Sequence, residues 1–154
     1  MKKFTAILCT AALALSLTAC GGKEKEVSLD PAKLAGELLE TVTSDTLSET
    51  SADLIPSTYF IEADDMEKGV AYASSGATAC EVVVIQSKDA GNTSNVEKQF
   101  QSRVKNQSDL YASYNQGEVD KLDKAIIRSA GAYTVLCVCD DTDKANEILK
   151  NSGF

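Results

Sequence analysis

The pattern of hydrophobic residues predicts about four β-strands. The clearest is Ala77 to Ser87, ATACEVVVIQS, which is rich in β-branched residues and apolar on both faces in its middle, as a central strand would be. Residues 70–74 predict a second strand. Residues 125–128 and 132–139 predict two more, joined by a hairpin around the sequence SAG. The chain should therefore contain a sheet with at least one strand buried on both sides.

Apolar residues recur at helical spacing in three other segments. An Asp-Pro pair is typical of a helix start and predicts a helix over 31–43. A Ser-x-x-Glu capping box predicts a long helix over 94–113. A last helix should begin after three closely spaced aspartates, because acidic groups complement the positive end of the helix dipole.

The remaining segments give weaker patterns. We expect residues 44–58 and 115–123 to be loops, residues 59–61 to form a short strand or turn, and ADDMEKGV to form one helical turn closed by Gly69. The resulting order is helix, strand, strand, long helix, strand, strand, helix. This order predicts an α+β domain, with an antiparallel sheet of about four strands and helices packed on one face.

The N-terminus has the layout of a secretory signal. Lys2 and Lys3 precede an apolar run that starts at Phe4, and this segment ends with small residues, the last of which is Ala19. The run is shorter than the roughly 20 residues that a membrane-spanning helix needs. A cleaved signal over residues 1–19 is therefore favoured over a membrane helix.

Leu17-Thr18-Ala19-Cys20 resembles the lipobox of bacterial lipoproteins. The resemblance implies that the Cys20 thiol receives a diacylglyceryl group and that a peptidase then cuts between Ala19 and Cys20. The alternative is a secreted protein with an incidental cysteine. We expect residues 1–19 to be the signal peptide, residues 20–28 a flexible tether and residues 29–154 a single domain. The expected location is the extracytoplasmic face of the bacterial cell membrane, with the lipid on Cys20 as anchor.

Charge and composition exclude several classes of function. The chain of 154 residues has a formal net charge of −8, which argues against nucleic acid as a partner. It contains no histidine, so Ser-His and Cys-His triads and histidine-based zinc chemistry are absent. We expect no cofactor and no metal, and no enzymatic activity. Carboxylate-based sugar hydrolysis is the least favoured alternative.

Three cysteines lie in the predicted domain: Cys80, Cys137 and Cys139. The last two are two residues apart in a strand-like run and should point to the same face. Three interpretations stay open: small apolar core residues, a disulfide between Cys80 and one of the others, or part of a metal site.

Glu81 and Arg103 are the most informative charged residues. Glu81 lies in the most apolar strand, and Arg103 follows Val96 and Phe100 on the helix stripe that should face the sheet. Because a single buried charge is costly, we expect the two to pair or to reach one polar pocket. Two interpretations are open: a structural ion pair, or a site in which Arg103 binds a ligand carboxylate.

The same residues carry a family resemblance. Glu81 begins the β-branched strand, Arg103 lies in the long helix, and Gly131-Ala132-Tyr133 leads into the last strand. Over residues 58–150 the chain resembles the small lipoproteins of Gram-positive anaerobes known as domain-of-unknown-function family 4358. The resemblance implies a surface-anchored domain and brings no known activity.

The sequence argues against two further kinds of site, an EF-hand calcium site and a carbohydrate platform. The acidic groups at 64, 65 and 67 and at 140, 141 and 143 lack the pattern of an EF-hand loop and fit helix starts and solvated faces better. Phe100, Tyr111 and Tyr114 are expected in the core and its rim. With no tryptophan in the chain, they are not expected to form a carbohydrate platform. The expected function is a non-enzymatic interaction or accessory module with an envelope protein as partner; the alternative is a small-ligand or peptide-binding lipoprotein.

Overall fold

A computed structural model describes residues 28–154. The predicted signal peptide, Cys20 and residues 20–27 of the predicted tether lie outside the described residues. The described chain forms one antiparallel sheet in the order β1-β2-β3-β5-β4. The strands are β1 (Ser48–Glu49), β2 (Met66–Ala73), β3 (Glu81–Ser87), β4 (Ile126–Ala130) and β5 (Tyr133–Val138). The predicted α+β class is thus confirmed, with five strands in the described part because the two-residue β1 adds to the four expected.

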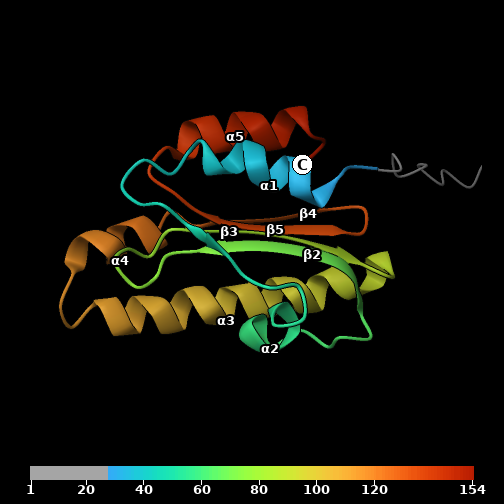
Figure 1. Cartoon of the computed structure of the whole chain (residues 1–154), viewed down its shortest axis with the longest axis horizontal. Coiled ribbons are helices and arrows are strands. Elements are labelled where there is room, and N and C mark those ends of the chain that lie inside the picture. Colours follow the sequence, from blue (N-terminus) through green and yellow to red (C-terminus); the bar gives the residue numbers. More distant parts are fainter. Residues whose placement is uncertain (1–27) are drawn as a thin grey trace, which may run out of the picture.

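The helices cover both faces of this sheet (Figure 1). They are α1 (Pro31–Leu39), α2 (Ile55–Tyr59), α3 (Thr93–Tyr111), α4 (Gln116–Leu122) and α5 (Thr142–Asn151), with a 3-10 turn η1 (Ala90–Asn92) before α3. α1 and α5 lie on one face, and α2 and α3 lie on the other. The expectation of helices on one face only was therefore wrong.

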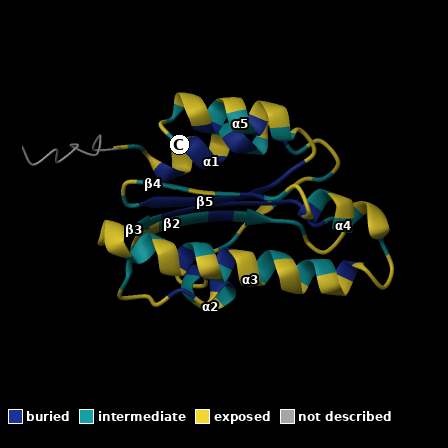
Figure 2. Ribbon diagram, turned by 180° about the vertical axis from the view of Figure 1, so that it is seen from behind, coloured by how far each residue is buried: buried dark blue, intermediate teal, exposed yellow. Residues whose placement is uncertain are grey.

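The two central strands explain why both faces are covered. β3 and β5 are buried along almost their whole length, as Figure 2 shows in dark blue. Val83 and Ile85 point into the core under α2 and α3, whereas Val82 and Val84 point into the core under α1 and α5. A strand that is apolar on both sides needs a layer of helices on each side.

Three local predictions fail for identifiable reasons. Residues 44–58 contain β1 and the start of α2, and α4 occupies most of the predicted loop 115–123. ADDMEKGV is not a helical turn, because β2 begins at Met66 and Gly69 pairs with Ile85 in the sheet. A Cβ on Gly69 would lie 3.1 Å from Cδ1 of Ile85 and 3.2 Å from Cδ1 of Ile55. The glycine therefore lets α2 pack closely on the strand.

The starts of α1 and α5 agree with the sequence predictions, and the start of α3 does not. Oδ1 of Asp30 accepts a hydrogen bond from the N–H of Ala32 at the start of α1. Asp141 caps α5 by accepting from the N–H of Lys144. α3 begins at Thr93 without a side-chain cap, so the predicted capping box is absent there. The 3-10 turn before α3 leads the chain into that helix instead.

Candidate functional site

Glu81 and Arg103 lie in direct contact between the sheet and α3. Glu81 is the first residue of β3, on the face that α3 covers, and Arg103 lies near the middle of α3. Nη2 of Arg103 is 2.6 Å from Oε1 of Glu81, and Nε of Arg103 donates to both carboxylate oxygens at 2.9 and 2.8 Å. The Glu81 side chain is 7% exposed and that of Arg103 is 21% exposed. The arrangement is a bidentate, largely buried ion pair.

Tyr59 completes this cluster from α2. Its hydroxyl donates to Oε1 of Glu81 at 2.6 Å, and Cζ of Arg103 lies 4.6 Å from the centre of its ring. Burial and then the Glu81 charge raise the pKa of Tyr59 well above its usual range. Burial alone would lower the pKa of Arg103, but the hydrogen bonds and charge of Glu81 outweigh it and raise that pKa. Both groups therefore stay protonated and donate hydrogen bonds to the Glu81 carboxylate.

A hollow of about 220 Å³ opens beside this cluster. Glu81 and Arg103 line it together with Gln107, Leu110 and other residues between β2, β3 and the end of α3. Among the described residues, Nη1 of Arg103 has no hydrogen-bond partner, since its bonds to Glu81 use Nε and Nη2. This hollow could admit a small ligand group that accepts a hydrogen bond from Nη1.

A second charged cluster, which the sequence did not reveal, surrounds Lys121 of α4. Nζ of Lys121 is 2.9 Å from Oδ1 of Asp140 and 3.3 Å from Oε2 of Glu118. It also lies 3.1 Å from Oγ of Ser44 and 3.2 Å from Sγ of Cys80. These four partners come from four separate segments of the chain. Lys121 thus ties α4 to the ends of the central strands, in a segment that was predicted to be a loop.

Besides its ion pair with Lys121, Asp140 binds the loop that follows α1. Its Oδ2 accepts from the N–H groups of Thr43 at 2.7 Å and Ser44 at 2.8 Å. Burial would raise the pKa of Asp140, but the bonds from Lys121, Thr43 and Ser44 outweigh it and hold that pKa well below its usual range. Asp140 is therefore a structural carboxylate. The sequence had placed it only at the start of a helix.

Lys121 is held as a charged hydrogen-bond donor. Ser44 and Cys80 both approach Nζ of Lys121. Burial opposes the charge on Lys121, yet the bond to Asp140 and the neighbouring groups raise its pKa above the usual value. The cluster therefore joins α4 to these segments through charge-assisted hydrogen bonds.

The cysteines of the domain are free thiols. Cys80, Cys137 and Cys139 are all buried, and none is in a disulfide. Cys137 and Cys139 lie in the core under α1 and α5. The two thiols influence each other, so that the pKa of Cys139 is lowered and that of Cys137 is raised. The interpretation as small apolar core residues is confirmed for Cys137 and Cys139, whereas the buried Cys80 contacts Lys121 and Ser44.

The predicted acidic groups do not assemble into a metal site. Across the described part of the chain, no three His, Cys, Asp or Glu side chains are arranged to hold a metal ion. Asp65 instead accepts a hydrogen bond from Nδ2 of Asn92, which connects the start of β2 to the start of α3. None of the helices in residues 28–154 combines the length and hydropathy that crossing a membrane requires.

Comparisons with known proteins give a family and no activity. No curated protein and no solved structure matches the chain. A family model described as a domain of unknown function, DUF4358, matches residues 41–139. The match begins just after α1 and ends just after β5, so it includes Glu81, Arg103 and all of the Lys121 cluster except Asp140. This protein therefore belongs to the DUF4358 family.

Proposed function

We propose that this protein is a lipid-anchored extracytoplasmic binding module that presents its α3 side to a partner in the cell envelope. The observation that carries the binding role is a group of exposed apolar side chains on that side. Phe60 is 75% exposed, Leu110 is 56% exposed and Tyr114 is 61% exposed. Exposed apolar side chains rimmed by polar ones are typical of interaction surfaces.

The position of the chain start supports this orientation. The described chain begins at Ser28 beside α1, in the layer on the opposite side of the sheet from α3 (Figure 1). A lipid on Cys20 would attach through residues that lead to this layer. The α3 side therefore stays free of the anchor and open to the envelope.

The anchor is tested by labelling and fractionation of the full chain. Wild-type protein expressed in a bacterial host should incorporate radioactive palmitate and sediment with membranes. The Cys20→Ala variant should lose the label, because only a thiol forms the thioether to the lipid. A Cys9→Ala variant is the matched control and should behave as wild type. A Cys20→Ala protein that still carries the label would contradict the proposal.

The binding surface is tested by photo-cross-linking in intact cells. A benzoylphenylalanine that replaces Leu110 on α3 should cross-link to an envelope component. The same group replacing Lys150, an exposed residue of α5, is the control and should give a much weaker product. Equal products at the two positions, or none at either, would contradict the assignment of the α3 side.

A second candidate function is recognition of a small ligand or peptide at the hollow beside Arg103. The free Nη1 of Arg103 and the volume of about 220 Å³ favour it. A ligand carboxylate there would accept a hydrogen bond from Nη1 while Glu81 keeps the rest of the guanidinium in place. An Arg103→Lys variant would keep the charge and lose the fork geometry. Its binding of a dicarboxylate such as succinate should fall if this hollow is the site.

A further inference from the structure

Phe60 combines two unfavourable features at the end of α2. Its backbone lies in the left-handed region, with φ 55° and ψ 37°. This conformation costs a residue with a side chain about 1–2 kcal/mol, which is why glycine or asparagine is usual at such helix ends. The residue is also 75% exposed, so packing within residues 28–154 offsets little of that cost. Strain of this kind is most often found at functional sites.

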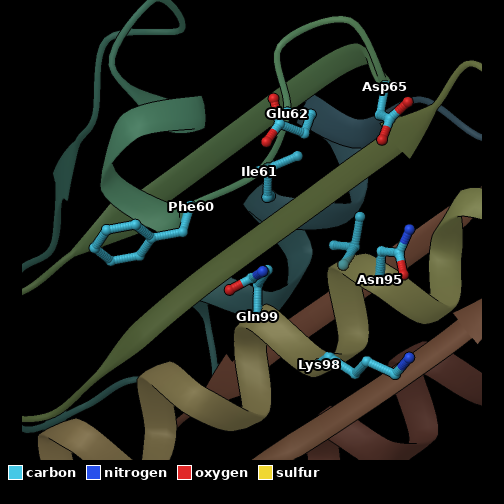
Figure 3. Close-up of a pocket in the computed structure, with 8 residues that line it drawn as sticks. Phe60, Ile61, Glu62, Asp65, Asn95, Lys98 and Gln99 are labelled. Carbon is cyan, nitrogen blue, oxygen red and sulfur yellow. The ribbon is translucent and has the colours of Figure 1, made fainter.

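Phe60 lines two hollows beside α3. One, of about 180 Å³, is drawn in Figure 3, with Phe60 at the end of α2 and Gln99 on the facing side of α3. The other, of about 260 Å³, is lined by Phe60 and by α3 residues from Gln99 to Leu110. Each is smaller than the roughly 300–1,000 Å³ typical of sites for drug-sized ligands. Each hollow therefore suits a single ring-sized unit, and Phe60 and Gln99 belong to both.

The larger hollow has a mixed polar and apolar lining with almost no free charge, whereas Glu62, Asp65 and Lys98 line the smaller one. Gln99, Asn106 and Gln107 contribute primary amides, and none of these amides has a hydrogen-bond partner among the described residues. Arg103 is the charged residue of this lining, and Glu81 neutralises it. In the larger hollow this neutrality favours an uncharged polar ligand, and in the smaller hollow the carboxylates of Glu62 and Asp65 can accept hydrogen bonds from hydroxyl groups. An acidic polymer would also be repelled by the net charge of −8.

These features match the chemistry of a sugar. A primary amide both donates and accepts hydrogen bonds, as neighbouring hydroxyl groups require. The negative face of an aromatic ring attracts the C–H groups on the apolar face of a pyranose. A peptide fits less well, because extended peptides bind to open strand edges and helical ones to long apolar grooves, and this site has neither. We propose that the site around Phe60 and Gln99 binds a neutral saccharide of two or more units.

This proposal rests on the binding role of the α3 side and names the class of its ligand. It departs from the expectation that sugar stacking is absent from this protein. That expectation considered Phe100, Tyr111 and Tyr114 and the lack of tryptophan. It did not include Phe60, whose exposure is visible only in the folded chain.

The test is calorimetry on the full chain in a zwitterionic detergent, since a sugar-based detergent would compete. The probes are maltotriose, cellotriose and triacetylchitotriose, with the neutral tetrapeptide Gly-Ala-Gly-Ala as the peptide probe. We expect at least one trisaccharide to bind and the peptide not to bind. Phe60→Asn should weaken that binding by about tenfold or more, because it removes the stacking face. Asparagine suits the left-handed backbone, so this variant should fold.

Gln99→Leu provides a second variant that keeps the helix and removes an amide, and it should also weaken binding. Gln101→Leu is the matched control, since Gln101 is exposed on α3 and lines neither hollow; it should bind as wild type. The proposal is overturned if no trisaccharide binds at about 20 mM, if Phe60→Asn and Gln99→Leu bind as wild type, or if only the peptide binds. A negative result here together with strong cross-linking at position 110 would reject the saccharide and leave the proposed binding role intact.

Discussion

Glu81 and Arg103 form a bidentate ion pair across the interface between β3 and α3, with the Glu81 side chain 7% exposed. The carboxylate receives a further hydrogen bond from Tyr59, so the charge is paired and its oxygens are satisfied. Such a pair does not by itself make a protein more stable, because the loss of hydration offsets much of the attraction. However, the loss of one partner leaves the other charge buried and unpaired, which strongly destabilises the fold.

Replacing one member of this pair should therefore cost more than replacing both. Arg103→Leu leaves the Glu81 carboxylate buried and unpaired, and should lower the free energy of unfolding by about 3–5 kcal/mol. The double variant Glu81→Leu/Arg103→Leu should be more stable than Arg103→Leu alone, because no buried charge remains. Urea denaturation followed by circular dichroism measures both.

Lys105→Leu gives the reference for an exposed pair on the same helix. Lys105 contacts Asp109, and both side chains are well exposed, at 72% and 66%. The loss of this pair should lower the free energy of unfolding by less than about 1 kcal/mol. If Arg103→Leu were no more damaging than Lys105→Leu, the Glu81–Arg103 pair would not hold the helix on the sheet. The case for Arg103 as a ligand-binding residue would then be stronger.

The free energy of unfolding should depend on pH through Asp140. Because its pKa in the folded protein lies below the usual 3.8, the folded state binds this proton more weakly than the unfolded state does. The contribution of Asp140 is therefore complete above the unfolded pKa and is lost as the pH falls toward the folded pKa. Asp140→Asn should lower stability by about 2 kcal/mol at pH 7, since it weakens hydrogen bonds to a charged group.

The difference between wild type and Asp140→Asn should shrink steadily as the pH is lowered from about 5 to 2. Thermal unfolding at a series of pH values measures it. Asp64→Asn is the control, because Asp64 is exposed and has no ion pair or side-chain hydrogen bond with another described residue. A difference that stays constant across this pH range would mean that the Asp140 charge does not stabilise the fold.

Phe60→Gly should stabilise the protein although it removes a large apolar side chain. Glycine adopts the left-handed conformation without the steric cost, and the exposed ring contributes little packing. We expect the free energy of unfolding to rise by about 0.5–1 kcal/mol. Chemical denaturation of the two proteins checks this.

Gln101→Gly, at an exposed position in the interior of α3, is the comparison. Glycine there should destabilise by about 0.5–1 kcal/mol, as in other helix interiors. Opposite signs at the two positions would show that Phe60 is kept at a cost to stability. A destabilised Phe60→Gly protein would instead show that the ring packs against the fold.

Gly69→Val should be destabilising, because α2 covers this position of β2. A side chain there meets Cδ1 of Ile85 and Cδ1 of Ile55 at little more than 3 Å. Overpacking of this kind typically costs about 1–3 kcal/mol. Gly36→Ala is the control, since no atom lies within 4 Å of a Cβ at that exposed position of α1, and it should be neutral or slightly stabilising. Equal stability of Gly69→Val and wild type would contradict the close packing of α2.

The secondary structure was predictable where the pattern of apolar residues was long and regular. The strand over Glu81–Ser87 and the helix over Thr93–Tyr111 follow from such patterns. The short elements were missed: α2 has five residues and α4 has seven, too few to show helical spacing. They form because the sheet gives Ile55, Tyr59 and Leu122 a core to pack against.

The candidate site likewise has one part that the sequence predicted and one part that it did not. The sequence singled out Glu81 and Arg103, because a charge inside an apolar strand or on an apolar helix stripe needs a partner. It gave no sign of the Lys121 cluster, because the charged members Glu118, Lys121 and Asp140 lie in polar segments where a charge needs no partner. Only the folding of α4 against the ends of β3 and β5 brings Lys121 to Asp140.

The sequence by itself therefore determined the α+β class, the main strands and helices, and the two charged residues that could not be buried alone. These follow from local periodicity and from the cost of desolvating a charge, which are properties of the chain itself. The apolar run of β3 also required cover on both faces, but the tertiary structure decided which helices form each layer. It decided as well that Lys121 and Asp140 meet and that Phe60 is exposed in a left-handed conformation. These features depend on which distant segments pack together, and nothing in the local sequence around each residue specifies that.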